Sequence, residues 1–129
     1  MATWDDVRDI VAKLPETTES VTYGDALCWR VRKKGFVWER PLRRKDLEAL
    51  GDASPTGQIL GAYVPDLGAK EALLADEPGV FTTPHFDDYP VILIRLDEIA
   101  VPELQEIVVE AWLDQAPKRL TQSYLSSRP

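Results

Sequence analysis

The stretch at residues 26–40, ALCWRVRKKGFVWER, decides the fold that the sequence predicts. Apolar and polar residues alternate along it, which is typical of a β-hairpin with one face turned towards a core. The pair Lys34-Gly35 is a suitable two-residue turn. In that register Val31 lies opposite Trp38, on a mostly apolar face. We therefore predict that this face meets the core and that the other face meets water or a partner.

The other face of the predicted hairpin is more polar. It carries Cys28, Val37 and three charged residues, Arg30, Arg32 and Glu39, with Arg30 opposite Glu39. A reactive thiol needs an electropositive, partly exposed setting, and Arg30 supplies positive charge on the same face as Cys28. We nevertheless interpret Cys28 as a half-buried structural residue.

Hydrophobic periodicity places further elements on both sides of the hairpin. Thr3 followed by Asp6 is a capping-box pattern, and Asp66 is a good N-cap. The last strand is apolar on both faces, which predicts a central position in a sheet. The expected helices span residues 3–14, 43–50, 66–76, 102–115 and 118–125, and the other expected strands span residues 58–64 and 91–96. This order predicts a single α+β domain over residues 1–129, an antiparallel sheet with helices packed on one face.

Composition excludes several classes of site. The 129 residues include one cysteine, so an intramolecular disulfide and a thiolate-built metal site are excluded. The one histidine excludes a multi-histidine metal site, and no glycine-rich phosphate loop occurs. We therefore expect neither a metal nor a cofactor. The first ten residues do not resemble a signal peptide, and the longest apolar run is residues 91–94, so we expect a cytoplasmic protein without membrane contact.

The distribution of charge is the most unusual feature of the sequence. The net charge is −7, which argues against attraction of the whole molecule to nucleic acid. However, eight of the fifteen lysines and arginines lie in residues 30–45 with a single acid, Glu39, so that segment carries +7 and the remainder −14. Such a segment can follow a phosphate backbone locally. Solvated charges that protect a strand edge remain the alternative.

Other candidate functional residues lie in turn-like segments. His85, in TTPHFDDYP, is a candidate general base or binding residue with Asp87 or Asp88 beside it, although no partner nucleophile has a diagnostic spacing. Three aromatic residues in turn-like segments, Tyr23, Phe86 and Tyr89, are candidates for stacking on a base or for filling a partner's pocket. The four tryptophans all fit apolar stripes, and we expect them in the core rather than on a base-stacking surface: Trp4, Trp29, Trp38 and Trp112.

Four blocks of sequence together resemble the MmcQ/YjbR family. They are TWDDVRDIVAKLPET from residue 3, SVTYGDALCWRVRKKGFVW from residue 20, KEALLADEPGVFTTPHFDDYPVILIRLDEI from residue 70 and PELQEIVVEAWLDQAPKRL from residue 102. Their most specific parts are the Tyr-Gly turn, the TPH-F-x-x-YP segment and the AW-x-x-x-APK end. Residues 40–57 look longer and more helical than the usual connection in the family. The motif positions are Tyr23, Gly24, Pro84, His85, Tyr89, Pro90, Lys118 and Arg119.

The resemblance implies a two-layer α+β fold similar to secretion-chaperone-like and frataxin-like proteins. It also implies a small bacterial cytoplasmic protein that binds DNA through a double wing of hairpins, with no catalytic residues to carry over. Together with the charge pattern, it predicts a non-catalytic DNA-binding module. The expected phosphate contacts are Arg30, Arg32, Lys34, Arg43, Arg44 and Lys45, beside a groove of Tyr23, His85, Tyr89, Lys118 and Arg119.

Two other functions stay open at this point. In the first, the basic hairpin binds an acidic protein partner in an adaptor of secretion-chaperone-like fold, because fold alone does not fix function. In the second, a small molecule binds or reacts around His85 and Tyr89.

Overall fold

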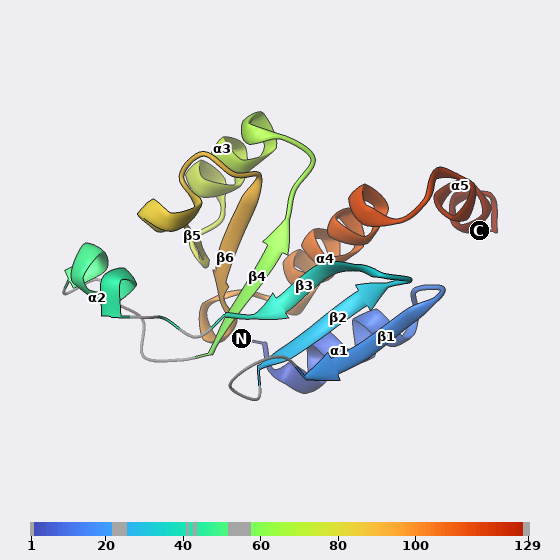
Figure 1. Ribbon diagram of the computed structural model, residues 1–129, viewed down its shortest axis with the longest axis horizontal. Coiled ribbons are helices and arrows are strands. Elements are labelled where there is room, and N and C mark those ends of the chain that lie inside the picture. The colour runs from blue at the N-terminus through green and yellow to red at the C-terminus, as the bar shows by residue number, and fades with distance from the viewer. Residues whose placement is uncertain (1, 22–25, 41, 43, 52–57, 128–129) are drawn as a thin grey trace.

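A computed structural model describes residues 2–21, 26–40, 42, 44–51 and 58–127 of the chain. These residues form an α+β fold around one six-stranded antiparallel sheet, which confirms the predicted class (Figure 1). The strand order is β1-β2-β3-β4-β6-β5. The strands are β1 (Thr17–Val21), β2 (Leu27–Val31), β3 (Lys34–Glu39), β4 (Ile59–Tyr63), β5 (Val80–Phe81) and β6 (Val91–Arg95).

The helices agree closely with those that periodicity and capping predict. Thr3 caps the first helix through a complete capping box with Asp6, and Asp66 caps the third helix by accepting a hydrogen bond from the Ala69 amide. The predicted strand at residues 91–96 is β6, and it lies between β4 and β5 as expected. The helices are α1 (Trp4–Ala12), α2 (Arg44–Leu50), α3 (Leu67–Asp76), α4 (Val101–Gln115) and α5 (Lys118–Ser127), with two short 3-10 helices, η3 (Pro84–Phe86) and η4 (Leu96–Glu98).

The main core lies between the sheet and helices α1 and α4, which cover one face of the sheet (Figure 1). We call this the helix face. A second, smaller cluster of Ile59, Phe81 and Leu93 lies on the opposite side of the same strands, where residues of α2 and η3 pack against it. Figure 1 shows α2 at one end of the molecule and α5 at the other.

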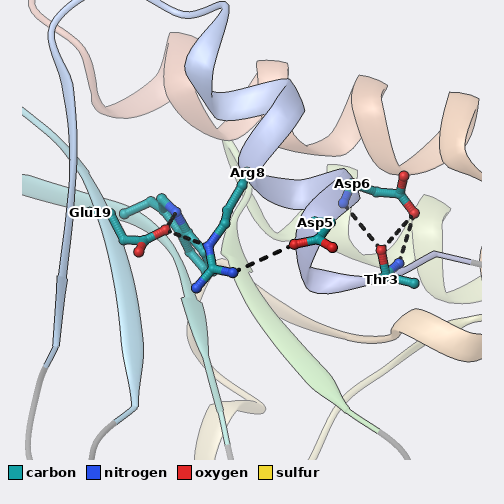
Figure 2. A network of polar contacts seen from close by, with 6 residues as sticks. Thr3, Asp5, Asp6, Arg8 and Glu19 are labelled. Carbon is teal, nitrogen blue, oxygen red and sulfur yellow. Dashed lines mark hydrogen bonds and ion pairs between the residues drawn. The ribbon is translucent and has the colours of Figure 1, made fainter.

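A polar network fastens α1 to the sheet (Figure 2). The Arg8 Nε donates to Glu19 Oε1 on β1 at 2.9 Å, and the same oxygen accepts a hydrogen bond of 2.9 Å from the Trp29 indole. Glu19 raises the pKa of Arg8, chiefly through that hydrogen bond. Because Glu19 contacts both layers at once, it lies on the helix face of β1.

The hairpin forms where the sequence predicts it, but its turn and register differ. The turn is Arg32-Lys33 rather than Lys34-Gly35, so Val31 pairs with Lys34 instead of facing Trp38. Arg32 adopts a φ of 55°, an unfavourable value for a residue with a side chain. Its backbone amide donates to the Glu16 carbonyl, and its guanidinium pairs with the Glu16 carboxylate at 3.1 Å. Glycine is the residue that this turn conformation favours. The two contacts with Glu16, the residue before β1, therefore stabilise Arg32 in that conformation instead.

A β-bulge is the second departure from the predicted hairpin. Trp29 pairs with Val37, whereas Arg30 pairs with Gly35, so Phe36 is an extra residue on β3. Phe36 and Val37 are both fully buried in the main core. The residues that follow are shifted by one position relative to strict alternation. Trp38 consequently lies opposite Cys28 and Gly61, on the face of the sheet away from α1 and α4.

The expected burial of the four tryptophans is confirmed for two of them and wrong for Trp38. Trp29 and Trp112 are 1% and 0% exposed. Trp4 is partly buried and stacks on Trp29 with ring centroids 5.9 Å apart. Trp38 is partly exposed and contacts Tyr63 instead, at 5.2 Å between centroids.

Candidate functional site

A cationic pocket lies between α2 and η3, at the end of the molecule where β3 leads into α2. It is a cavity of about 420 Å³. Residues 40 and 44–46 line one part of it, and Pro84 and His85, about 40 residues further along the chain, line the other. It brings together two predicted phosphate-contact residues and the predicted groove histidine. We define the pocket by the residues that line it, which are Arg40, Arg44, Lys45, Asp46, Pro84 and His85.

Arg40 forms the floor of the pocket and is held on three sides. Its backbone amide donates to the Ile59 carbonyl at 3.0 Å, so the residue continues the pairing of β3 with β4. Its guanidinium lies 3.1 Å from Asp46 Oδ2, and both side chains are nearly inaccessible to water. The guanidinium also lies over the Phe86 ring, 5.4 Å from the centroid. Arg40 thus contacts residues of β4, α2 and η3 at once. The sequence analysis did not identify it as a candidate site residue.

The other cations of the pocket are accessible. Arg44 and Lys45 are exposed in the first turn of α2, and Arg44 forms an exposed ion pair of 3.3 Å with Glu48. Such exposed pairs contribute little to stability and are screened by salt. His85 is exposed and contacts Phe86 edge-on at 4.6 Å between centroids. With Asp46 already paired to Arg40, the accessible wall of the pocket is positively charged.

A buried lysine positions the loop that carries His85. Lys70 on α3 is only 4% exposed, and its Nζ donates to the carbonyls of Phe86 and Tyr89. Burial lowers the pKa of Lys70, and the negative charges of Asp87 and Asp88 partly offset that effect. Sequence reasoning missed this role because the acceptors are backbone carbonyls, which no sequence pattern marks.

Replacing Lys70 with methionine is expected to loosen the loop between β5 and β6. Methionine retains a long flexible side chain but leaves the Phe86 and Tyr89 carbonyls without their charged donor. Hydrogen bonds from charged groups contribute about 1.5–3 kcal/mol each. Hydrogen exchange of the Phe86 and Tyr89 amides should therefore quicken. Lys118→Met, at an exposed lysine, is the control, and unchanged exchange in Lys70→Met would show that Lys70 does not hold the loop.

The structure separates the remaining predicted phosphate contacts. Arg30 is the last residue but one of β2, whereas Arg32 is paired with Glu16 at the hairpin turn. Lys34 is exposed at the same turn and lines a second cavity, of about 360 Å³, with Gln115 and Pro117. Arg43 lies outside the described residues. The basic segment is thus divided between the two ends of β3.

The predicted groove is not assembled as one surface either. Tyr89 is 59% exposed but does not line the pocket that contains His85. Lys118 and Arg119 begin α5, at the opposite end of the molecule from α2 (Figure 1). Tyr23 and Gly24 lie outside the described residues.

Two general features of the described residues bear on the site. Among them, no three His, Cys, Asp or Glu side chains are grouped as a metal ion would require. Each helix in this part of the chain is too short or too polar to cross a membrane.

Comparison with known proteins identifies the family. The YjbR family profile matches residues 12–113, which is most of the chain. The chain belongs to the YjbR family. Two curated relatives are 55% identical over 131 residues and match 98% of both chains, namely uncharacterized protein Rv2570 of Mycobacterium tuberculosis and uncharacterized protein Mb2600 of Mycobacterium bovis.

A solved structure supports the same fold for this YjbR protein. The crystal structure of Deinococcus radiodurans protein DR2400, which has a DUF419 domain, matches with a TM-score of 0.67 and 17% sequence identity. The match covers 95% of this chain and 88% of the other. At that identity the likeness concerns the fold alone.

Proposed function

We propose that this YjbR protein is a non-catalytic nucleic-acid-binding module and that backbone phosphates occupy the cationic pocket. The observation that supports this most directly is the convergence of Arg44, Lys45 and His85 around one cavity of about 420 Å³. The one carboxylate that lines it, Asp46, is paired with Arg40. Phosphate oxygens are accommodated well by exposed arginine and lysine side chains at such a cavity.

Electrostatics determines how strong and how selective this binding is. Contacts to phosphate carry no direct sequence information, so we expect weak sequence preference. The net charge of −7 opposes binding at long range. At physiological salt the screening length is about 8 Å, so the local charge of the pocket dominates over the distant acidic residues. In this proposal the β2–β3 hairpin is one wing of the double wing that the family resemblance implies, and the protein acts in the cytoplasm.

Reversing two charges of the pocket tests the proposal. In the Arg44→Glu/Lys45→Glu variant, the affinity for a labelled oligonucleotide should fall by about tenfold or more at low salt. The slope of log affinity against log salt should become shallower by about two, because each lost phosphate contact removes about one unit. Fluorescence anisotropy at several salt concentrations measures both quantities.

Lys118→Glu/Arg119→Glu is the matched control. It changes the net charge by the same amount at two adjacent residues, at the far end of the molecule. We expect it to weaken binding only slightly. Equal losses in the two variants would show that overall charge, and not the pocket, governs binding. A wild-type protein that binds no oligonucleotide at low salt would overturn the proposal itself.

A second candidate function is peptide binding, and a groove between α3 and α4 favours it. The groove has a volume of about 270 Å³, and apolar residues such as Ala69 and Leu73 line it together with Glu106 and Glu110. It therefore suits a basic, partly apolar peptide, in contrast to the acidic partner expected for the hairpin. A nuclease-insensitive complex that Glu106→Lys/Glu110→Lys abolishes would favour this function over the first.

A further inference from the structure

The sheet has a second face, opposite α1 and α4, that carries an aromatic pair beside the cationic pocket. We call it the open face and define it by Arg30, Cys28, Trp38, Gly61 and Tyr63. We propose that the open face binds single-stranded nucleic acid by stacking bases on Trp38 and Tyr63 while the cationic pocket holds a neighbouring phosphate. This inference rests on the proposed function and specifies which form of nucleic acid is bound.

The β-bulge creates the aromatic pair. Without the extra residue Phe36, strict alternation would direct Trp38 towards the main core. With it, Trp38 and Tyr63 lie on the same face of adjacent strands, and their ring centroids are 5.2 Å apart at 59°. Neither side chain is a member of the two hydrophobic clusters, and both are partly exposed. An aromatic pair outside the core is available to a ligand.

A glycine makes room for the tryptophan ring on the neighbouring strand. A Cβ atom built on Gly61 would lie 2.5 Å from Trp38 Cε2 and 2.7 Å from its Nε1. The indole therefore occupies the space that a side chain at position 61 would fill. Trp38 is partly exposed in this position, and stacking on a base requires an accessible part of the ring.

The charges on this face favour a polyanion. Strands β1 to β4 contain two acidic residues, Glu19 and Glu39, and neither is on the open face. Glu19 contacts Trp29 on the helix face, and Glu39 pairs in register with the core residue Leu60. The charged side chain of the open face in these strands is Arg30, which lies opposite Thr18 and Gly35.

The aromatic pair and the cationic pocket are close enough to serve adjacent nucleotides. Trp38 and Arg40 are two residues apart in extended backbone, so they share a face and lie about 7 Å apart. Arg30 is one diagonal position from Trp38 on the other side. Arg40 is buried and paired with Asp46, so the phosphate next to a base stacked on Trp38 would be bound by the exposed pocket cations Arg44 and Lys45, with Arg30 on the other side. A duplex cannot use this arrangement because its bases are stacked on one another, whereas a single strand exposes base faces.

Titration of matched single-stranded and duplex oligonucleotides tests the inference. We would use pyrimidine oligomers of about 12 nucleotides, as DNA and as RNA, since sites of this kind cover about 4–16 nucleotides. The wild-type protein should bind the single strand more tightly than the duplex. Trp38→Leu should reduce affinity for the single strand by about 5- to 150-fold, the range for one stacked base, and leave duplex binding nearly unchanged.

Tryptophan fluorescence separates stacking from a general effect on folding. Trp29 and Trp112 are fully buried and Trp4 stacks on Trp29, so quenching by a bound base should come from Trp38. Trp38→Phe should restore most of the affinity without the quenching. Tyr63→Leu provides a second variant that does not depend on the tryptophan, and thermal unfolding verifies that each variant is folded.

The outcomes distinguish this inference from the function on which it rests. Single-strand binding that the Trp38 and Tyr63 variants leave unchanged, or a preference for duplex, would overturn the inference and leave the pocket proposal intact. If Arg44→Glu/Lys45→Glu loses single-strand binding while the Trp38 and Tyr63 variants retain it, the inference is likewise wrong and the pocket proposal is supported. If the wild-type protein binds neither form, both the proposed function and this inference are wrong.

Discussion

Replacing Asp46 with alanine is expected to lower the free energy of unfolding by about 3–5 kcal/mol, because it removes one partner of a buried ion pair. The Arg40 and Asp46 side chains are 9% and 5% exposed, and their nearest charged atoms are 3.1 Å apart. Domains of this size lose about 3–5 °C in Tm per kcal/mol, so the melting temperature should fall by about 10–20 °C. Urea denaturation followed by tryptophan fluorescence measures the loss.

An exposed ion pair of the same helix provides the control. Arg44 and Glu48 lie one turn apart on α2, and removing both as alanines should cost about 0–1 kcal/mol. The double variant Arg40→Leu/Asp46→Leu should recover much of the stability that Asp46→Ala loses, since apolar residues of similar size tolerate burial without charge. If Asp46→Ala lowered the free energy of unfolding no more than removal of the exposed Arg44–Glu48 pair does, the buried ion pair between Arg40 and Asp46 would not stabilise the fold.

Local sequence signals predicted the helices and the strands β2, β3, β4 and β6 because the forces that set them are local, whereas β1 and β5 were not predicted. The capping box of Thr3 and Asp6 begins α1, and Asp66 begins α3, as their side chains dictate. The doubly apolar pattern of β6 reflects its burial on both faces. These features depend on residues within a few positions of one another, so a single sequence reveals them.

The hairpin shows where local reasoning fails. A bulge inserts one residue without changing composition, so alternation alone cannot reveal that Phe36 and Val37 face the same way. The turn at Arg32 depends on Glu16, which lies sixteen residues earlier in the chain. The consequence reaches the functional argument, because the bulge is what transfers Trp38 from the expected core to the open face.

The candidate site was predicted in part for the same reason. Arg44 and Lys45 stood out because cations are concentrated in their segment, and His85 stood out as the one histidine. Their meeting in one pocket depends on packing around Phe86, which contacts the Arg40 guanidinium and the small core beneath α2. Such contacts between distant segments leave no pattern in a single sequence.

Replacing Trp112 with alanine should destabilise the protein by about 3–5 kcal/mol, the cost of a large cavity in a packed core. Trp112 is fully buried on α4 and connects three segments. Its indole Nε1 donates to the Pro15 carbonyl at 3.2 Å, and its ring lies 5.0 Å from that of Tyr124 on α5. The variant therefore loses packing, a hydrogen bond across 97 residues of sequence and the support of the C-terminal helix.

Two further variants separate these contributions. Trp112→Phe keeps most of the packing but leaves the Pro15 carbonyl without its donor, so an intermediate loss is expected. Tyr124→Ala removes the α5 side chain that packs against Trp112, and it should increase hydrogen exchange in α5 while the rest of the protein stays folded, because terminal elements open at low free energy. Since α5 lies at the opposite end from the cationic pocket, Tyr124→Ala should leave oligonucleotide binding unchanged. A global loss of stability in Tyr124→Ala as large as that in Trp112→Ala would show that α5 is part of the cooperative core rather than an appendage to it.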